Sequence, residues 1–281
     1  MTTRARTGIA LAIAATLLVV LGIVVSNWLN SHHNPFQAAP ACNAAGDSYD
    51  LTPEQAGNAA TIGAIGIQRG LPDRAVTIAL AAAMQESKLR NLDYGDADSV
   101  GLFQQRPSQG WGPAAKLQQP RYAAGKFYDV LVKVRAWQTR PLTVVAQAVQ
   151  RSGYPDAYAQ WEPTAKALSA ALTGTQPAAL SCNYPNPAHG QPATAAAALT
   201  ADLAVRPHAT GTALAVPVAT SRGGWRVASW AVAKGQQYGV TEVHYAGKVW
   251  RHGDSSWQPE KVPSGSGVHI MLAKSVAAAV G

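Results

Sequence analysis

Glu86 is a carboxylate at the end of a run rich in alanine, where its neighbours predict a buried helix. On such a helix it shares a face with three alanines that precede it by three, four and seven residues. Close packing of these alanines would put the carboxylate at the margin of a core. Loss of hydration and the negative end of the helix dipole would then raise its pKa. A carboxyl group that stays protonated near neutral pH can serve as a glycosidic general acid. The alternative interpretation is a solvated helix end, or an ion pair with a neighbouring arginine.

A loop rich in glycine and amide side chains follows this run. Gly101 lets the backbone approach a ligand closely, and Gln104 and Gln105 offer amide donors and acceptors suited to N-acetyl and hydroxyl groups. Trp111 and, farther along, Tyr154 offer flat apolar faces for sugar rings. Taken alone, each of these residues is more typical of a turn or a core. Their spacing from the preceding glutamate is what favours a site.

The order and spacing of three motifs resemble those of a known enzyme fold. Glu86-Ser87 is followed after fifteen residues by "GLFQ" and later by "TVVAQAVQRSGYPDAY". Residues 51–173 thereby resemble the lysozyme-like domain of soluble lytic transglycosylases and goose-type lysozymes, whose catalytic helix ends in Glu-Ser and whose next motif reads Gly-Leu-Met-Gln. Phe103 replaces the methionine, and "AQAVQ", residues 146–150, stands where the family has Ala-Tyr-Asn-Ala-Gly. The run from "GLFQQRPSQGWG" onward is also similar to a group of exported bacterial proteins with this domain.

The resemblance implies a peptidoglycan-cleaving glycosidase, either a lytic transglycosylase or a muramidase. It would act on the β-1,4 bond between N-acetylmuramic acid and N-acetylglucosamine, with Glu86 as general acid and then base and with no cofactor. The residues expected to shape the site or contact sugar are Ser87, Gly101, Gln104, Gln105, Trp111, Gln147 and Tyr154. The altered third motif motivates an alternative from another class, a non-catalytic lysozyme-fold protein that binds or scaffolds the cell wall.

Three aspartates in the intervening loop are candidates for a second catalytic carboxylate. A two-carboxylate glycosidase needs its second acid within about 5–10 Å of the first, and Asp93, Asp96 and Asp98 lie between the two motifs. The transglycosylase branch of the family manages with one glutamate, because the substrate's own N-acetyl and 6-hydroxyl groups complete the reaction. The aspartates are therefore interpreted as solvated loop residues, and both hydrolysis and transglycosylation stay open.

Other chemistries have little support in the sequence. The seven histidines are scattered, and no His-Glu-x-x-His or Cys-x-x-Cys spacing occurs, so no metal site is expected. Ser87 has no histidine within reach by sequence logic, which argues against a serine hydrolase. A net charge of +8 suits an anionic membrane or cell wall, and no nucleic-acid partner is expected of an exported chain.

The first thirty residues are interpreted as a membrane anchor. Arg4 and Arg6 precede an uncharged run at 8–25 that approaches the length needed to span a bilayer. Arginines on the short side predict a cytoplasmic amino terminus and a single pass through the bacterial cytoplasmic membrane, with the domains on the cell-wall side. Cleavage near "FQAAPA" would instead give a secreted protein.

Two cysteines on the exported side predict one disulfide. An oxidising compartment and an even count favour a bond between Cys42 and Cys182, which would clamp the two ends of the helical region. The alternative is a pair of free thiols.

The elements that must position the site are helices. Thr52, Pro53 and Gln55 predict a helix start, and further helices are expected from Pro72, from Pro120, over 142–151 and over 155–172. Such a series is typical of a compact all-α domain. After a segment rich in proline and alanine, a helical run and three strands follow.

The predicted fold class is mainly α: a lysozyme-like all-α domain plus a small C-terminal α+β domain, preceded by one transmembrane helix. The last domain is expected to dock wall or a protein partner. Its four tryptophans, at helical and strand spacing, are more typical of a core than of a binding face. The predicted division is an anchor at 1–30, a tether at 31–50, the lysozyme-like domain at 51–182, a linker at 183–222 that carries a short helix, and the α+β domain at 223–281.

Overall fold

The computed structural model describes residues 39–45, 47–153, 156–187, 189–260 and 267–274. The predicted membrane anchor and the first part of the tether lie outside these residues. Within the described ranges, no helix combines the length and the apolar character needed to cross a bilayer. The chain from Pro40 onward forms one compact unit.

The first part of this unit is helical and begins with a strand. The strand β1 (Ala41–Ala44) precedes α2 (Pro53–Gln68), α3 (Asp73–Ser87), η1 (Pro107–Gln109), α4 (Ala114–Leu117), α5 (Pro120–Leu131), α6 (Leu142–Gln150), η2 (Ala159–Trp161) and α7 (Glu162–Leu172). The predicted capping box is confirmed: Thr52 accepts a hydrogen bond from the Gln55 backbone, and the Gln55 side chain accepts one from the Thr52 backbone.

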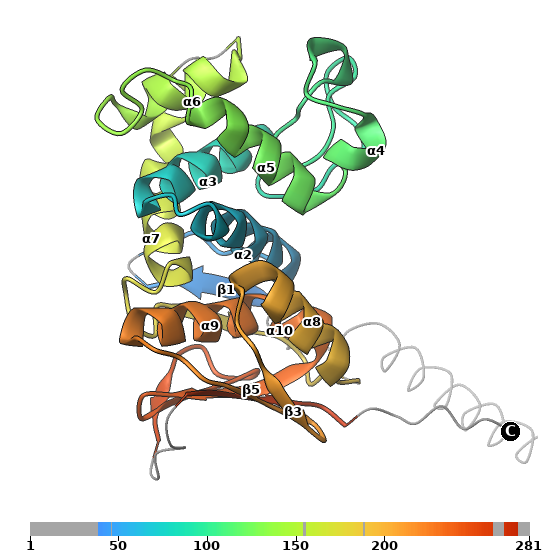
Figure 1. Cartoon of the computed structure of the whole chain (residues 1–281), viewed down its shortest axis with the longest axis vertical. Helices are drawn as coiled ribbons and strands as arrows, with labels where there is room; N and C mark the ends of the chain where they lie inside the picture. Colours follow the sequence, from blue (N-terminus) through green and yellow to red (C-terminus); the bar gives the residue numbers. More distant parts are fainter. Residues whose placement is uncertain (1–38, 46, 154–155, 188, 261–266, 275–281) are drawn as a thin grey trace, which may run out of the picture. The chain divides into compact units, whose positions relative to one another are not determined.

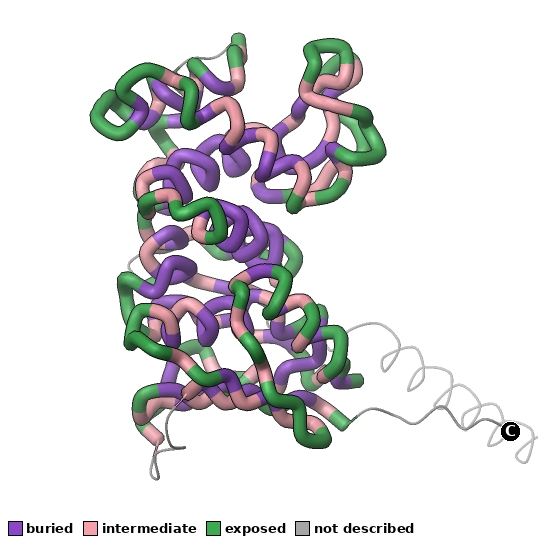
Figure 2. The backbone as a smooth tube through the Cα atoms, viewed as in Figure 1, coloured by how far each residue is buried: buried purple, intermediate pink, exposed green. Residues whose placement is uncertain are grey.

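Helices α2 and α3 form the centre of the helical part. Helix α3 packs against α2, α5, α6 and α7, and its residues from Ala75 to Met84 are all buried. Helix α3 is rich in alanine, whose small side chain lets the neighbouring helices approach closely. Figure 2 shows this part of the chain as buried. The helix that carries the candidate acid is therefore held by packing along most of its length.

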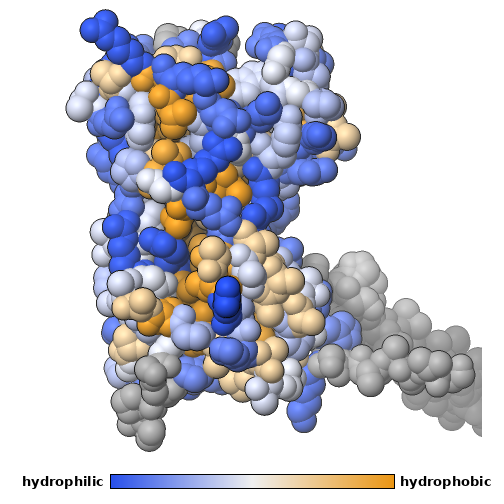
Figure 3. Space-filling view, viewed as in Figure 1, coloured by the Kyte–Doolittle hydropathy of each residue, from blue (hydrophilic) through white to orange (hydrophobic). Residues whose placement is uncertain are grey.

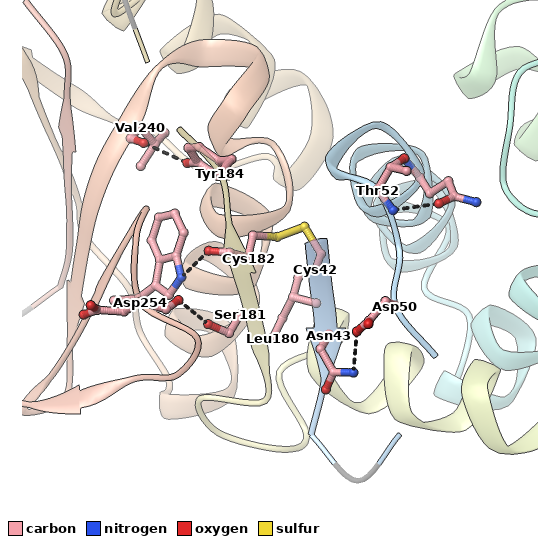
Figure 4. Close-up of a disulfide and its surroundings, with 12 residues drawn as sticks. Cys42, Asn43, Asp50, Thr52, Leu180, Ser181, Cys182, Tyr184, Val240 and Asp254 are labelled. Atoms are coloured by element: carbon pink, nitrogen blue, oxygen red, sulfur yellow. Dashed lines mark hydrogen bonds between the residues drawn. A yellow bond between two sulfur atoms is a disulfide. The ribbon is translucent and has the colours of Figure 1, made fainter. Parts of the chain in front are cut away.

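The predicted disulfide is confirmed, and the residues around it form a small sheet. Strand β1 pairs antiparallel with β2 (Leu180–Asn183), with Cys42 opposite Cys182 and joined to it (Figure 4). Cys42 also exchanges two backbone hydrogen bonds with Leu51. The last part of the predicted tether is thus a paired strand, whose pairing the sequence did not predict.

The second part of the unit is built on a six-stranded antiparallel sheet. Its helices are α8 (Pro192–Leu203), α9 (Ser221–Ala233) and α10 (Gly235–Tyr238). Its strands are β3 (His208–Thr210), β4 (Ala213–Val216), β5 (Val240–Tyr245), β6 (Lys248–Arg251), β7 (Gln258–Pro259) and β8 (Val268–Leu272), in the order β3-β4-β8-β5-β6-β7. The segment predicted to be a linker contains α8, β3 and β4.

Helix α9 joins the two parts through a shared core. It packs on β5 and β8 on one side and on α2 and α7 on the other (Figure 1). The four tryptophans at positions 225, 230, 250 and 257 are buried here, as the sequence favoured. Trp250 and Trp257 donate to the carbonyls of Cys182 and Leu180, which ties the sheet to β2. In the space-filling view, hydrophobic residues gather along the middle of the visible face (Figure 3).

The predicted fold class is wrong: the described chain is an α+β protein rather than a mainly α one. The sheet has six strands where the sequence predicted three: β3 and β4 form a hairpin, β4 pairs with the distant β8, and β7 pairs with the preceding strand β6. Strands such as β4, "ALAV", carry little β-branched signal and owe their conformation to pairing in the folded protein.

Candidate active site

The end of α3 is fixed by an unusual backbone turn and by two side chains of α2. Lys88 and Leu89 both adopt left-handed conformations, with φ of 55° and 60°. The side chains of Gln55 and Asn58 donate to their carbonyls at 2.6 Å and 2.8 Å. The first bond satisfies the carbonyl of the C-cap residue, and the second satisfies that of the residue after it. The position of Glu86 therefore depends on packing between helices as well as on its own helix.

Glu86 itself is half-buried and hydrogen-bonded. The Tyr158 hydroxyl donates to Glu86 Oε1 at 2.6 Å, and Tyr158 is buried. Loss of hydration raises the pKa of Glu86, while hydrogen bonds from Tyr158 and Gln150 and the charge of Lys88 act in the opposite direction. The loss of hydration is the largest of these effects, so the pKa of Glu86 is raised overall. This is the direction that the sequence predicted for a general acid.

Glu86 lines a polar cavity of about 410 Å³. The other lining residues come from the loop after α3 and from the end of α6: Asp96, Ser99, Phe103, Gln104, Gln105, Arg106, Gln109, Trp111, Gln150, Arg151, Ser152 and Gly153. Three of the predicted sugar-binding residues, Gln104, Gln105 and Trp111, are therefore brought to the same cavity as the glutamate.

Ser87 and Gly101 lie outside the cavity lining and hold its walls together. The Ser87 side chain is buried, and its hydroxyl donates to the Leu102 carbonyl at 2.8 Å. Gly101 has a φ of 78°, and a Cβ there would lie 2.5 Å from the Leu117 carbonyl oxygen. Both residues thus position the loop that follows α3, which is a structural task within the site.

The two loop glutamines behave differently. Gln104 has a φ of 46°, and its amide donates to the carbonyls of Gly101 and Tyr94 at 3.2 Å and 3.3 Å. Gln105 is 1% exposed and donates to the Ala123 carbonyl, while its buried Oε1 has no hydrogen-bond partner among the described residues. Gln104 therefore presents the more accessible amide to the cavity.

Of the three remaining residues predicted to contact sugar, one lines the cavity, one does not, and one is not described. Trp111 lines the cavity and packs partly against the core. The Gln147 amide donates to the Ser152 carbonyl at 2.7 Å and does not line the cavity. Tyr154 lies outside the described residues.

The three loop aspartates occupy distinct settings. Asp98 is paired with Arg106 at 2.8 Å and accepts from the Ser108 backbone and hydroxyl. The Arg106 side chain and the Ser108 bonds lower the pKa of Asp98 to about 2. Its carboxylate therefore stays ionised, and its oxygens are engaged by these two residues. Asp96 lines the cavity, whereas Asp93 does not. Of the three, Asp96 is the one that shares the cavity lining with Glu86.

Tyr158 and Gln150 are partners of Glu86 that sequence reasoning missed. Gln150 donates to the Phe103 carbonyl at 2.7 Å and also bonds Glu86, so it connects the loop to the acid. Both residues lie in the run "TVVAQAVQRSGYPDAY", where the third family motif was expected but is altered, and this position was the available signal. Periodicity gave no reason to choose Tyr158 over Tyr154.

Comparison with protein-family models finds no matching family, and comparison with curated proteins finds no significantly similar sequence. The fold and the site together define an α+β protein with a partly desolvated carboxyl group in a cavity rich in amides. Among the described residues, no group of three histidine, cysteine or acidic side chains is arranged to hold a metal ion.

Proposed function

We propose that this protein is a glycosidase that cleaves peptidoglycan at the bond between N-acetylmuramic acid and N-acetylglucosamine. The observation that carries the proposal is Glu86: a half-buried carboxyl group with a raised pKa that lines a polar cavity and is held by Tyr158. A proton donor of this kind is what cleavage of a glycosidic bond requires.

The chemistry begins with protonation of the bridging oxygen. Glu86 gives its proton to the leaving oxygen as the bond from that oxygen to the anomeric carbon breaks, and the ionised Glu86 accepts the Tyr158 hydrogen bond. Glu86 then takes a proton from the oxygen that forms the new bond to the anomeric carbon: a water oxygen gives a reducing end, and the 6-hydroxyl oxygen of the same sugar gives an anhydro end. Asp96 is the lining carboxylate that would orient a water in the first case.

The lining of the cavity supports a carbohydrate substrate. Gln104, Gln109 and Gln150 bring amide groups, which pair with the N-acetyl and hydroxyl groups of amino sugars. Trp111 supplies an aromatic surface at the same cavity. This mixture of amide groups and aromatic rings suits a sugar better than a purely apolar ligand.

The cellular setting in this proposal is the outer side of the bacterial cytoplasmic membrane. The disulfide between Cys42 and Cys182 supports an oxidising compartment, where peptidoglycan is also found. The amino-terminal segment is proposed to anchor the protein there, and removal of that segment would give a secreted form.

Release of soluble fragments from purified peptidoglycan tests the proposal. Residues 40–281 of the wild type should release muropeptides, and Glu86→Gln should lower the rate by about three orders of magnitude or more, because it removes the transferable proton. Mass spectrometry of the fragments then separates the two reactions, since anhydro ends mean transglycosylation and reducing ends mean hydrolysis.

The matched control is Glu54→Gln, the same substitution at an exposed position in the first turn of α2. It should leave the rate unchanged. Equal release by the wild type and Glu86→Gln would sink the catalytic proposal. Binding of both proteins to peptidoglycan without release would favour the non-catalytic wall-binding alternative.

A further inference from the structure

A second and larger cavity adjoins the one at Glu86. It has a volume of about 760 Å³ and lies between the loop 109–111, α5, the turn after α5, and the end of α6. Four residues line both cavities: Gln109, Trp111, Gln150 and Arg151. A ligand whose scissile bond lies at the glutamate can therefore continue past Trp111 into the second space.

The second cavity is cationic. Lys126, Lys133 and Arg151 line it, and no ion pair engages any of them among the described residues. The one lining carboxylate, Asp129, is already paired with Arg69 at 2.8 Å. Lys126 has a tyrosine ring 5.6 Å from its ammonium group, which leaves its hydrogen-bond donors free for an anion. The second cavity thus carries a net positive charge on side chains that a ligand can reach.

Part of the lining of this cavity is apolar. Val130, Val132 and Val149 line it beside Trp111, and Val132 is 46% exposed. An exposed valine beside free cations suits a ligand with both aliphatic side chains and carboxylates. N-acetylglucosamine has the wrong chemistry for this combination, because it carries neither a carboxylate nor an aliphatic side chain.

We infer that the second cavity holds the stem peptide of peptidoglycan, with Lys126 and Lys133 bound to its carboxylates. The inference rests on the proposed function, because the peptide reaches this space only when the sugar that carries it lies at Glu86. Each N-acetylmuramic acid bears such a peptide, built from alanine and residues with free carboxyl groups. The enzyme would therefore select glycan that still carries acidic peptides.

The test measures binding to a non-cleaving protein, Glu86→Gln, by calorimetry. The two probes are a disaccharide pentapeptide with free carboxylates and the same compound with those carboxylates converted to amides, which keeps the size and removes the charge. We expect the acidic probe to bind about three- to tenfold more tightly at low salt, and this preference to shrink as salt is added.

Adding Lys126→Ala and Lys133→Ala should abolish the preference while leaving the affinity for the amidated probe within about twofold. The matched control is Lys166→Ala with Lys274→Ala, which removes the same charge from exposed positions elsewhere. It should keep the preference. Equal binding of both probes to the Glu86→Gln protein, or a preference that survives loss of both cavity lysines, would overturn the inference.

The outcome is separable from that of the glycosidase assay. If the wild type releases fragments but both probes bind alike, the glycosidase stands and the peptide subsite falls. If no fragments are released and the acidic probe still binds through the two lysines, the subsite stands in a protein that binds the wall without cleaving it.

Discussion

The hydroxyl of Tyr158 donates a hydrogen bond to Glu86 Oε1 at 2.6 Å, across 72 residues of sequence. Tyr158 is buried, and both burial and the neighbouring Glu86 raise the pKa of its phenol, so it remains a donor. A donor fixed in this way favours the ionised form of the carboxylate. Tyr158 is thus a positioning residue that moderates the effect of burial on its partner.

Tyr158→Phe should raise the pKa of Glu86 further. A general acid works while it is protonated, so the alkaline limb of the pH–activity profile should move upward by about one pH unit, as loss of a hydrogen bond to a charged group implies. The control is Tyr128→Phe, which removes a buried hydroxyl that is bonded to the Ile62 carbonyl and not to the acid. An alkaline limb unmoved in Tyr158→Phe would show that this bond does not set the pKa.

Glu86→Gln should stabilise the protein more at pH 8 than at pH 4. The pKa of Glu86 is raised above its ordinary value of 4.5, so below pH 4.5 the side chain is protonated in both states. As the pH rises through the folded pKa, the wild type loses stability, by about 1.4 kcal/mol for each unit of the raised pKa, and the glutamine variant does not. Urea unfolding at both pH values measures the difference. A constant difference would contradict the assigned direction.

Gly101→Ala should cost more stability than Gly110→Ala. The two glycines have φ of 78° and 81°, so a side chain strains the backbone equally at both, by about 1–2 kcal/mol. At Gly101 the added Cβ also meets the Leu117 carbonyl oxygen at 2.5 Å, whereas at Gly110 no described atom lies within 4 Å. Denaturant unfolding should show an additional loss of about 1 kcal/mol or more for the first variant. Equal losses would mean that the loop yields freely at Leu117.

Replacing both Cys42 and Cys182 by alanine should lower the free energy of unfolding by about 2–5 kcal/mol. The bond closes a loop with a sequence separation of 140, and its loss frees that loop in the unfolded chain. Chemical denaturation measures the change. Reducing agent should bring the wild type to the stability of the variant and leave the variant unaffected. A variant as stable as the oxidised wild type would refute a structural role for the bond.

Local sequence signals predicted the helix that carries the acid. The capping box at Thr52 and the alanine run before Glu86 are contained within a few residues, and the structure has α2 and α3 where these signals put them. Burial of the alanine face then follows from helical spacing alone. This is why the environment of Glu86 could be anticipated without knowledge of its partners.

The partners of the acid depend on contacts that no local pattern records. Tyr158 reaches Glu86 from a segment near η2, and Gln150 reaches the same site from the end of α6. The sequence offered several tyrosines and glutamines of equal merit nearby. Only the packing of α6 and η2 against α3 distinguishes them.

The sheet was underestimated for a related reason. Strand β1, "ACNA", and strand β4, "ALAV", are short and built from residues with weak strand preference. Pairing with β2 and β8 gives them their conformation. Helix α8 was partly anticipated, but its flanking strands were hidden in a composition that is typical of linkers.

The disulfide sets the route by which mechanical force enters the molecule. Cys42 is the second residue of β1, and its bond leads to Cys182 in β2, beneath the tryptophans of the C-terminal sheet. A pull on the chain before β1 would therefore act on β2 and that sheet through the disulfide, as well as on α2 through the backbone. If the proposed anchor holds the chain, the disulfide would divide a load on it between α2 and the C-terminal sheet, and so reduce the part that reaches the end of α3.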